Sequence, residues 1–162
     1  MIKLEVLKKM NTEEKYRYML ILLEGQLNSE TDSLANICNA SAIISAVLDR
    51  LNWVGFYLMK RDVLVLGPFQ GLPACNRIEV GKGVCGMSVL TKKVIRVENV
   101  HEFPGHIACD SASNSEIVFP LIKNDIVYGV LDIDSPECGR FTELEQKYLT
   151  VFVQKLNDKI NW

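Results

Sequence analysis

The chain has 162 residues, of which 48% are hydrophobic and 23% charged, with a net charge of −2. This mixture is typical of a globular domain, and the balanced charge gives no electrostatic reason to expect a nucleic acid or an anionic membrane as a partner. No apolar run approaches the ~20 residues that span a bilayer, and the N-terminus has no apolar region of the signal-peptide type. We therefore expect a single cytoplasmic domain over residues 1–162.

Helical signals begin after an N-terminal arm or short helix, which we expect over residues 1–10. Asn11 and Glu14 match a capping box, and apolar residues at helical spacing continue from there to Leu27. The pattern predicts an amphipathic helix that begins at Asn11.

A second helix is expected from Leu34 to Leu51, because apolar residues recur along one of its faces. Cys38 lies in this helix, and we interpret it as a small buried hydrophobe. The polar residues 28–31 separate the two helices.

The pattern changes at Trp53, where aromatic and β-branched residues begin to dominate. Two such runs, 53–59 and 63–69, are separated by a short polar turn and predict an antiparallel hairpin. Short strands are expected at 77–80 and 94–97, with a glycine-rich turn and a short helix between them.

The glycine-rich turn from Gly81 to Gly86 has literal G-x-G-x-x-G spacing. A dinucleotide site would need parallel strands in a βαβ unit and an acidic residue about 20 residues further on, whereas the neighbouring strands are expected to be antiparallel. We interpret the glycines as permitting a tight turn that presents Cys85. A helix dipole at that position would favour the thiolate form of its side chain.

A long loop at 98–115 precedes a second hairpin, with strands expected at 116–122 and 126–134. A capping box at Thr142 and Glu145 then opens the last helix. This order of elements predicts an α+β fold, with a central, mainly antiparallel sheet of about six strands flanked by N-terminal and C-terminal helices.

Three acidic residues are expected to share one face of the second hairpin. Asp132 and Asp134 are two apart on one strand and therefore point the same way, and Glu116 opens the neighbouring strand. Carboxylates on a buried face need a cation, and a substrate ammonium is such a cation; a solvated strand face is the alternative. Trp53 and Tyr57 add aromatic surface that suits either an apolar ligand or an ordinary core.

Five cysteines at wide spacing favour buried, metal-binding or redox thiols over a framework of structural disulfides. Cys75, Cys85 and Cys109 fall in loops or at a helix start, and His106 would lower the pKa of the Cys109 thiol. A redox function needs an attacking thiolate and a second thiol within reach. The alternatives are three unrelated buried thiols, or a zinc site formed by His101, His106, Cys109 and either Cys75 or Cys85.

Four segments carry distinctive motifs: Gly67-Pro68-Phe69-Gln70-Gly71 with Ala74-Cys75, Gly81-Lys82-Gly83-Val84-Cys85-Gly86, Pro104-Gly105-His106-Ile107-Ala108-Cys109-Asp110 with Ser113, Ser115-Glu116-Ile117, and Gly129-Val130-Leu131-Asp132-Ile133-Asp134-Ser135. With these motifs the chain resembles the free methionine-(R)-sulfoxide reductases, a family built on the GAF domain. The match runs from the first helix to the last. Generic GAF domains share the fold but lack this set of cysteines.

The resemblance implies a thiol-dependent reductase that converts free L-methionine-(R)-S-oxide to L-methionine and binds no cofactor. By resemblance, the thiolate of Cys109 attacks the sulfoxide sulfur and becomes a sulfenic acid. Either Cys75 or Cys85 then forms an intramolecular disulfide with it, and thioredoxin restores the thiols as the external reductant. An arrangement in which Cys85 attacks first stays open.

The resemblance also implies that Glu116, Asp132 and Asp134 hold the ammonium and polar groups of the substrate, one of them acting as general acid. Trp53 and Tyr57 would line the wall for the sulfoxide methyl group. A methionine within a polypeptide lacks the charged nitrogen, so this site should reject it. A homodimer is implied as well. The rival interpretation is a non-catalytic GAF module that binds a small molecule or senses redox state.

Overall fold

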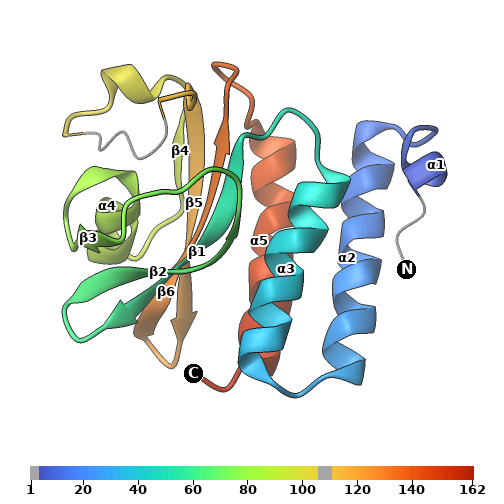
Figure 1. Cartoon of the computed structure of the whole chain (residues 1–162), viewed down its shortest axis with the longest axis horizontal. Helices are drawn as coiled ribbons and strands as arrows, with labels where there is room; N and C mark the ends of the chain where they lie inside the picture. Colours follow the sequence, from blue (N-terminus) through green and yellow to red (C-terminus); the bar gives the residue numbers. More distant parts are fainter. Residues whose placement is uncertain (1–3, 106–110) are drawn as a thin grey trace.

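The computed structural model describes residues 4–105 and 111–162. Figure 1 shows a central sheet with α3 and α5 against one face, α2 packed on the outer side of these two helices, and α4 against the other face of the sheet. The elements in chain order are α1 (Leu4–Leu7), α2 (Thr12–Ser29), α3 (Ser33–Val47), β1 (Trp53–Lys60), β2 (Val63–Gln70), β3 (Arg77–Glu79), α4 (Gly83–Thr91), β4 (Ile95–Val97), the 3-10 helix η1 (Val100–Glu102), β5 (Ser115–Lys123), β6 (Ile126–Ser135) and α5 (Glu143–Lys159).

Two capping boxes start the long helices, as predicted. The Asn11 side chain accepts a hydrogen bond from the backbone N–H of Glu14, and the Glu14 side chain accepts one from the backbone N–H of Asn11. Thr142 and Glu145 make the same reciprocal pair at the start of α5. Each box satisfies backbone donors that the first turn of a helix leaves unpaired.

The second helix differs from its prediction in length and in the exposure of Cys38. It begins after Asp32, whose side chain accepts from the N–H of Ala35, and ends at Val47 rather than at Leu51. Cys38 is exposed, so its interpretation as a buried hydrophobe is wrong. Successive helical residues are rotated by about 100°, and Cys38 follows the buried Ile37, which turns its side chain out of the core.

The sheet has six strands in the order β3-β2-β1-β6-β5-β4, and every neighbouring pair is antiparallel. The predicted antiparallel α+β architecture is therefore confirmed. A tight turn joins β5 to β6 through Asn124 and Asp125, which have φ values of 51° and 63°. Such left-handed pairs favour Asn and Asp and match the twist of a hairpin. A register shift between Leu121 and Ile122 then places Glu116 opposite Asp134.

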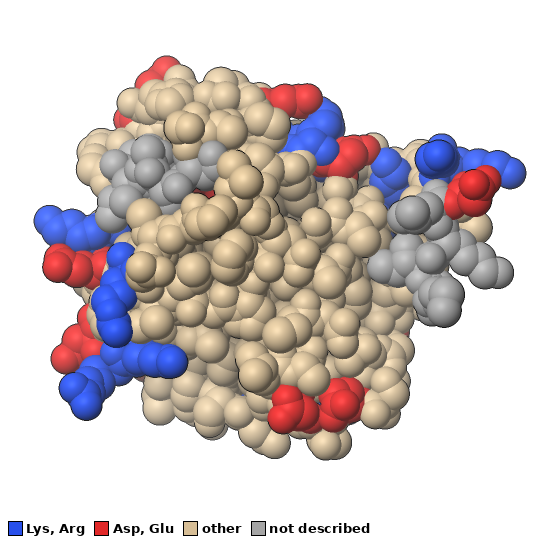
Figure 2. All heavy atoms as spheres, viewed as in Figure 1, with Lys and Arg blue, Asp and Glu red and all other residues tan. Residues whose placement is uncertain are grey.

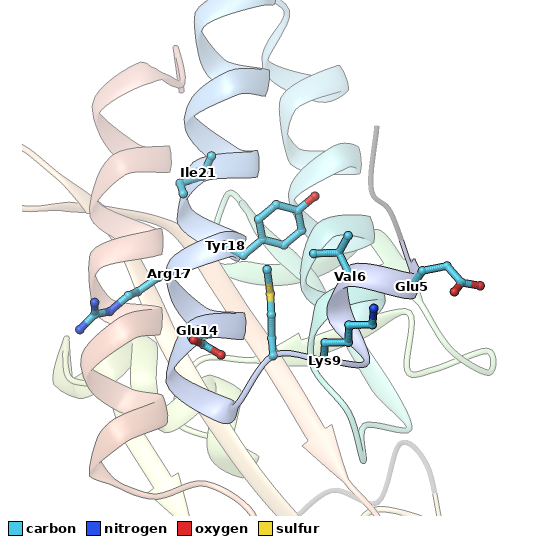
Figure 3. A pocket seen from close by; sticks show the side chains of 8 residues that line it. Glu5, Val6, Lys9, Glu14, Arg17, Tyr18 and Ile21 are labelled. Atoms are coloured by element: carbon cyan, nitrogen blue, oxygen red, sulfur yellow. The ribbon is translucent and has the colours of Figure 1, made fainter.

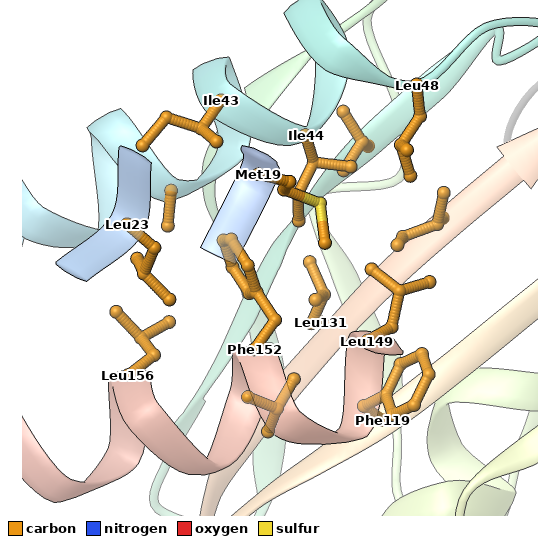
Figure 4. Packing of buried hydrophobic residues seen from close by; sticks show 14 of the residues in the cluster. Met19, Leu23, Ile43, Ile44, Leu48, Phe119, Leu131, Leu149, Phe152 and Leu156 are labelled. Atoms are coloured by element: carbon orange, nitrogen blue, oxygen red, sulfur yellow. The ribbon is translucent and has the colours of Figure 1, made fainter. Parts of the chain in front are cut away.

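Alternation along the strands divides the sheet into two unlike faces. The face toward α3 and α5 is largely apolar, and Figure 4 shows Leu131 and Phe119 of the sheet among helix residues that include Met19, Ile44 and Phe152. The opposite face carries the acidic and aromatic residues that the sequence singled out. The large helical core thus supports the sheet from behind, which leaves the other face for chemistry.

Charged side chains lie mostly near the edges of the face in Figure 2, with basic and acidic residues intermingled. Its central area is formed by other residue types. Among the helices of residues 4–105 and 111–162, none has the length and apolar character needed to cross a membrane.

Candidate functional site

Three carboxylates gather on the sheet face that is turned away from the three long helices. Glu116 of β5 lies directly opposite Asp134 of β6, and Asp132 lies two residues along on the same face. Their exposed fractions are only 5%, 9% and 7%, respectively. The expected common face is present, and because it is buried, the alternative of a solvated strand face is wrong.

Cys85 lies against these carboxylates from the first turn of α4. It is 3% exposed, and its Sγ atom is 3.9 Å from Glu116 Oε1. Burial, followed by the negative charges of Asp132 and Glu116, raises the pKa of the Cys85 thiol well above its ordinary value. The expectation that the helix dipole makes it a thiolate is therefore wrong, and Cys85 is a neutral thiol at neutral pH.

The same burial and close approach of acidic groups also change the pKa values of the carboxyl groups. Burial, followed by the charges of Asp132 and Asp134, raises the pKa of Glu116 well above its ordinary value. Burial also raises the pKa of Asp132 to about 6. Within the described residues, Asp132 Oδ1 is buried without a hydrogen-bond partner. A site with these properties retains a proton and offers an unsatisfied acceptor to a cation.

The glycine-rich turn shapes the approach of α4 to this face. Gly81 and Gly83 have positive φ values of 83° and 58°, which glycine adopts without strain. A Cβ atom on Gly86 would lie 2.3 Å from the carbonyl oxygen of Glu79, so only glycine permits this contact. The strands on either side are antiparallel, and the motif therefore forms a tight turn rather than a dinucleotide site.

Three aromatic rings form a wall beside the carboxylates, which we call the aromatic wall: Trp53, Tyr57 and Phe69. The Trp53 ring stacks on Tyr57 and on Phe69, with centroid distances of 5.8 and 5.4 Å. Trp53 and Tyr57 are 2% and 1% exposed. The sequence analysis did not assign Phe69 to the wall, because a register shift in the β1–β2 hairpin is what brings Phe69 opposite Gly55.

The aromatic wall also holds the loop that carries Cys75. The Tyr57 hydroxyl donates to the carbonyl oxygen of Cys75 at 3.0 Å, and Trp53 Nε1–H donates to the carbonyl oxygen of Leu72 at 3.1 Å. Burial raises the pKa of Tyr57 far above its usual range, which keeps the hydroxyl proton in place as a donor. Cys75 is disulfide-bonded, whereas Cys85 is a free thiol.

Two of the predicted site residues, Cys109 and His106, lie outside the described residues. The alternative zinc site also included His101, which is exposed. Its Nε2 atom lies 2.9 Å from Asn114 Oδ1. Among the described residues, the only group of thiol, imidazole and carboxylate atoms close enough to share a metal ion is formed by Cys85, Glu116 and Asp132, which does not include this histidine.

Gly55→Ala is expected to displace the aromatic wall. A Cβ atom there would lie 2.4 Å from Phe69 Cβ and 2.6 Å from Trp53 Cη2, and overpacking of this kind costs about 1–3 kcal/mol. Urea unfolding should show that loss, together with a changed tryptophan fluorescence spectrum. Gly25→Ala is the matched control, because a Cβ on Gly25 in α2 meets nothing within 4 Å; it should raise stability by about 0.5–1 kcal/mol. Equal stability of both variants would contradict this account of Gly55.

A separate surface hollow of about 460 Å³ lies between α1 and α2. Val6 and Tyr18 point toward one another across it (Figure 3). Val6 and Ile21 are 40% and 62% exposed. The hollow lies on the outer side of the helical layer (Figure 1), so it is remote from the carboxylates and takes no part in their chemistry.

Comparison with known proteins adds independent information. Residues 40–157 match a protein-family model described as "GAF domain". The chain is 53% identical to "Protein YtsP" of Bacillus subtilis, over 89% of this chain and 90% of that protein. It is 50% identical to a "Free methionine-R-sulfoxide reductase" of Escherichia coli, over 91% of this chain and 89% of that protein.

A solved structure extends the similarity to the fold. It is an X-ray structure of free methionine-R-sulfoxide reductase from Neisseria meningitidis in complex with its substrate, and its TM-score with this chain is 0.89. The two sequences are 39% identical, and the match covers 93% of this chain and 90% of that chain. The similarity therefore includes the sheet, both helical layers and the strands that carry the carboxylates.

Proposed function

This chain belongs to the free methionine-R-sulfoxide reductase family of GAF domains, and from that premise we propose that it reduces free L-methionine-(R)-S-oxide to L-methionine. The observation that carries the proposal is the pairing of the buried carboxylates Glu116, Asp132 and Asp134 with the aromatic wall. The carboxylates suit the α-ammonium group and the rings of Trp53 and Tyr57 suit the methyl group of this substrate.

We assign the attack on the sulfoxide to Cys109, on the strength of the motif resemblance. Its thiolate bonds to the substrate sulfur while the sulfoxide oxygen takes up a proton. The S–S bond then breaks with its electron pair going to the methionine sulfur, and the hydroxyl passes to the cysteine as methionine leaves. Cys109 becomes a sulfenic acid. Cys85 is the weaker candidate for this step, because its raised pKa keeps it protonated and a thiol attacks far more slowly than a thiolate.

We assign the second step to Cys75. Its thiol condenses with the sulfenic acid, which forms a disulfide and releases water. The disulfide-bonded state of Cys75 and the free state of Cys85 favour this assignment over Cys85. A thioredoxin-type dithiol then reduces the disulfide, so that each turnover consumes two electrons and two protons and yields methionine and water. The protein is accordingly an oxidoreductase that uses an external dithiol.

Glu116 is the best candidate for the general acid. Its raised pKa favours the protonated form, which is what a group needs to donate a proton to the sulfoxide oxygen as the S–O bond weakens. Asp132, with a pKa of about 6, is largely ionised at neutral pH and would hold the ammonium. Glu116 thus acts as the proton donor and Asp132 as the acceptor for the cation.

Free methionine-R-sulfoxide should be reduced at least about a hundredfold more efficiently than its N-acetyl derivative. The derivative replaces the ammonium with a neutral amide, and leaving a buried charge unpaired costs about 3–5 kcal/mol. A thioredoxin-coupled assay with separated R and S diastereomers, each free and N-acetylated, measures this directly.

The same assay separates the enzyme from the alternative, a GAF module that only binds a small molecule or senses redox state. A sensor would show no turnover of any of the four compounds. Equal turnover of free and N-acetylated substrate would instead contradict the assignment of the carboxylates.

Tyr57→Phe is expected to slow disulfide formation while sparing the release of methionine. The change keeps the ring and removes the hydrogen bond to the Cys75 carbonyl oxygen, an interaction of about 1 kcal/mol, so disulfide formation should slow by roughly fivefold to tenfold. Rapid-quench counts of methionine, trapped sulfenic acid and free thiols distinguish the two steps.

Tyr128→Phe is the matched control, since Tyr128 stacks on Trp162 and lies outside the aromatic wall. A Tyr57→Phe enzyme that slows methionine release, and not disulfide formation, would show that the hydroxyl serves the substrate instead.

We also propose a homodimer, following the family resemblance. The exposed side chains of Val6 and Ile21 beside the hollow between α1 and α2 supply an apolar surface of the kind that subunits cover. The molar mass in solution tests the proposal, and a mass of one 18.3 kDa chain at micromolar concentration would contradict it.

A further inference from the structure

Cys85 places a sulfur atom in a site whose oxygen atoms are sufficient to hold an ammonium. Cys85 Sγ and one carboxylate oxygen each from Glu116 and Asp132 lie within 4.8 Å of one another. All three residues are more than nine-tenths buried. A neutral thiol is a weak hydrogen-bond acceptor, so the sulfur contributes little to binding an ammonium.

A second observation points independently to a cation at this position. Asp132 Oδ1 is buried and, within the described part of the chain, has no hydrogen-bond donor. Buried polar atoms are nearly always satisfied, and an exception requires an explanation. A positively charged group between Asp132, Glu116 and Cys85 would satisfy this oxygen.

We propose that Cys85, Glu116 and Asp132 form a binding site for a thiophilic divalent cation of the zinc type. Cysteine sulfur and carboxylate oxygen are both zinc ligands, and at Zn–S and Zn–O distances of ~2.3 and ~2.0 Å a tetrahedral site separates sulfur from oxygen by ~3.5 Å. The distance from Cys85 Sγ to Glu116 Oε1 is 3.9 Å, so this pair needs a shift of only a few tenths of an ångström, and the Asp132 oxygen lies within 4.8 Å of both atoms. Water would take the fourth position.

The thiol also determines which cations bind. Mg²⁺ and Ca²⁺ require oxygen ligands, typically six or more, whereas this site offers one sulfur and carboxylates from a closed pocket. Binding replaces the S–H bond with a metal–sulfur bond, and the thiol proton leaves to solvent. The site is therefore selective for Zn²⁺ and Co²⁺ over the hard alkaline-earth ions.

Metal and substrate should exclude one another. This consequence rests on the proposed function, because it requires Asp132 to hold the substrate ammonium and Glu116 to protonate the sulfoxide oxygen. Carboxyl groups that coordinate a metal ion cannot contact the substrate at the same time, so a zinc-type ion acts as a competitive inhibitor.

Co²⁺ titration of the purified protein tests the site without reference to activity. The protein is kept in the state in which Cys75 is disulfide-bonded, and the exposed free thiols are removed by Cys38→Ser and Cys138→Ser, so that Cys85 is the free thiol among the described cysteines. We expect a thiolate-to-cobalt charge-transfer band and the intense visible bands of a tetrahedral ion. Zn²⁺ should abolish these bands, and excess Mg²⁺ should not.

Variants connect the signal to the three ligands. Cys85→Ser on the same background should lose the charge-transfer band, and Asp132→Asn should weaken Co²⁺ binding at least tenfold, with circular dichroism to confirm that each variant is folded. Absence of the band in the parent protein, or its persistence after Cys85→Ser, would overturn the proposal. If Cys85→Ser does not fold, loss of affinity in Asp132→Asn supports the site and unchanged affinity overturns it.

Free methionine-R-sulfoxide should raise the apparent Kd for Co²⁺ in proportion to its concentration. If the cobalt bands form and depend on Cys85 but the sulfoxide does not compete, the metal site stands and the assignment of Asp132 and Glu116 to the substrate fails. Different results would therefore contradict the metal site and the proposed function.

Discussion

Asp132→Asn is expected to lower kcat/KM for free methionine-R-sulfoxide by about thirtyfold or more. The side chain keeps its shape but loses the charge that faces the ammonium, and truncating one partner of a buried charge pair costs about 2–5 kcal/mol. Asp132 is 7% exposed, so solvent screens little of that loss. Steady-state kinetics measure the effect, with Asp62→Asn in the exposed turn between β1 and β2 as the control.

The same substitution is expected to stabilise the protein without substrate at neutral pH. Burial raises the pKa of Asp132 from 3.8 to about 6, so the folded state binds the proton more tightly than the unfolded state. The contribution of this group to stability is therefore greatest below pH 3.8 and is lost as the pH rises through about 6. The Asp132→Asn variant has no such loss, because its amide does not ionise.

Urea unfolding at a series of pH values tests the predicted direction of this change in stability. The advantage of Asp132→Asn over the unchanged protein should grow between about pH 4 and pH 6 and then stay constant. A variant that is inactive and also less stable at pH 8 would indicate that Asp132 supports the fold, and it would contradict the assignment of this carboxylate to the substrate.

Local pattern was sufficient to predict only part of the carboxylate cluster. Asp132 and Asp134 share a face because side chains alternate along a strand. The turn between β5 and β6 alone would pair Glu116 with Ile133, and a register shift in this hairpin brings Glu116 opposite Asp134 instead. The expected common face was correct, but the pairing that forms it depends on an irregularity that sequence periodicity does not reveal. The capping boxes, in contrast, located the starts of α2 and α5 well, because each box is complete within one turn of its helix.

The environment of Cys85 could not be predicted in this way. The helix dipole is a local feature of the glycine-rich turn, and by itself it favours a thiolate. The residues that raise the pKa of Cys85 come from β5 and β6, which lie far from it in the sequence. Burial and like charge outweigh a dipole effect that is typically about 0.3–1 kcal/mol at an exposed site.

The packing of Phe69 could not be predicted from local sequence pattern either. Its membership of the aromatic wall depends on Gly55, which lies opposite it across the β1–β2 hairpin and leaves room for the Trp53 ring. A bulge between Gly55 and Tyr57 shifts the pairing along that hairpin, and sequence periodicity does not reveal a bulge. The register of the β1–β2 hairpin, rather than the residue types, therefore explains why Phe69 was not predicted to belong to the aromatic wall.

Cys75→Ser is expected to abolish sustained turnover with thioredoxin while permitting one equivalent of methionine to form. Without a resolving thiol, the sulfenic acid left by the first attack cannot become an intramolecular disulfide. Cys109→Ser should lose even the first equivalent. Rapid-quench measurement of methionine per enzyme, followed by the thioredoxin-coupled rate, distinguishes loss of the first attack from loss of disulfide formation.

Cys85→Ser is expected to keep multiple turnover, with a change in rate of less than about tenfold. A buried neutral thiol beside Glu116 is a poor partner for a sulfenic acid, since resolution also requires a thiolate. Its replacement alters the contacts of one carboxylate but not the path of the electrons. If Cys85→Ser instead stopped after one equivalent and Cys75→Ser continued, Cys85 would be the resolving cysteine, and the disulfide at Cys75 would have a purely structural role.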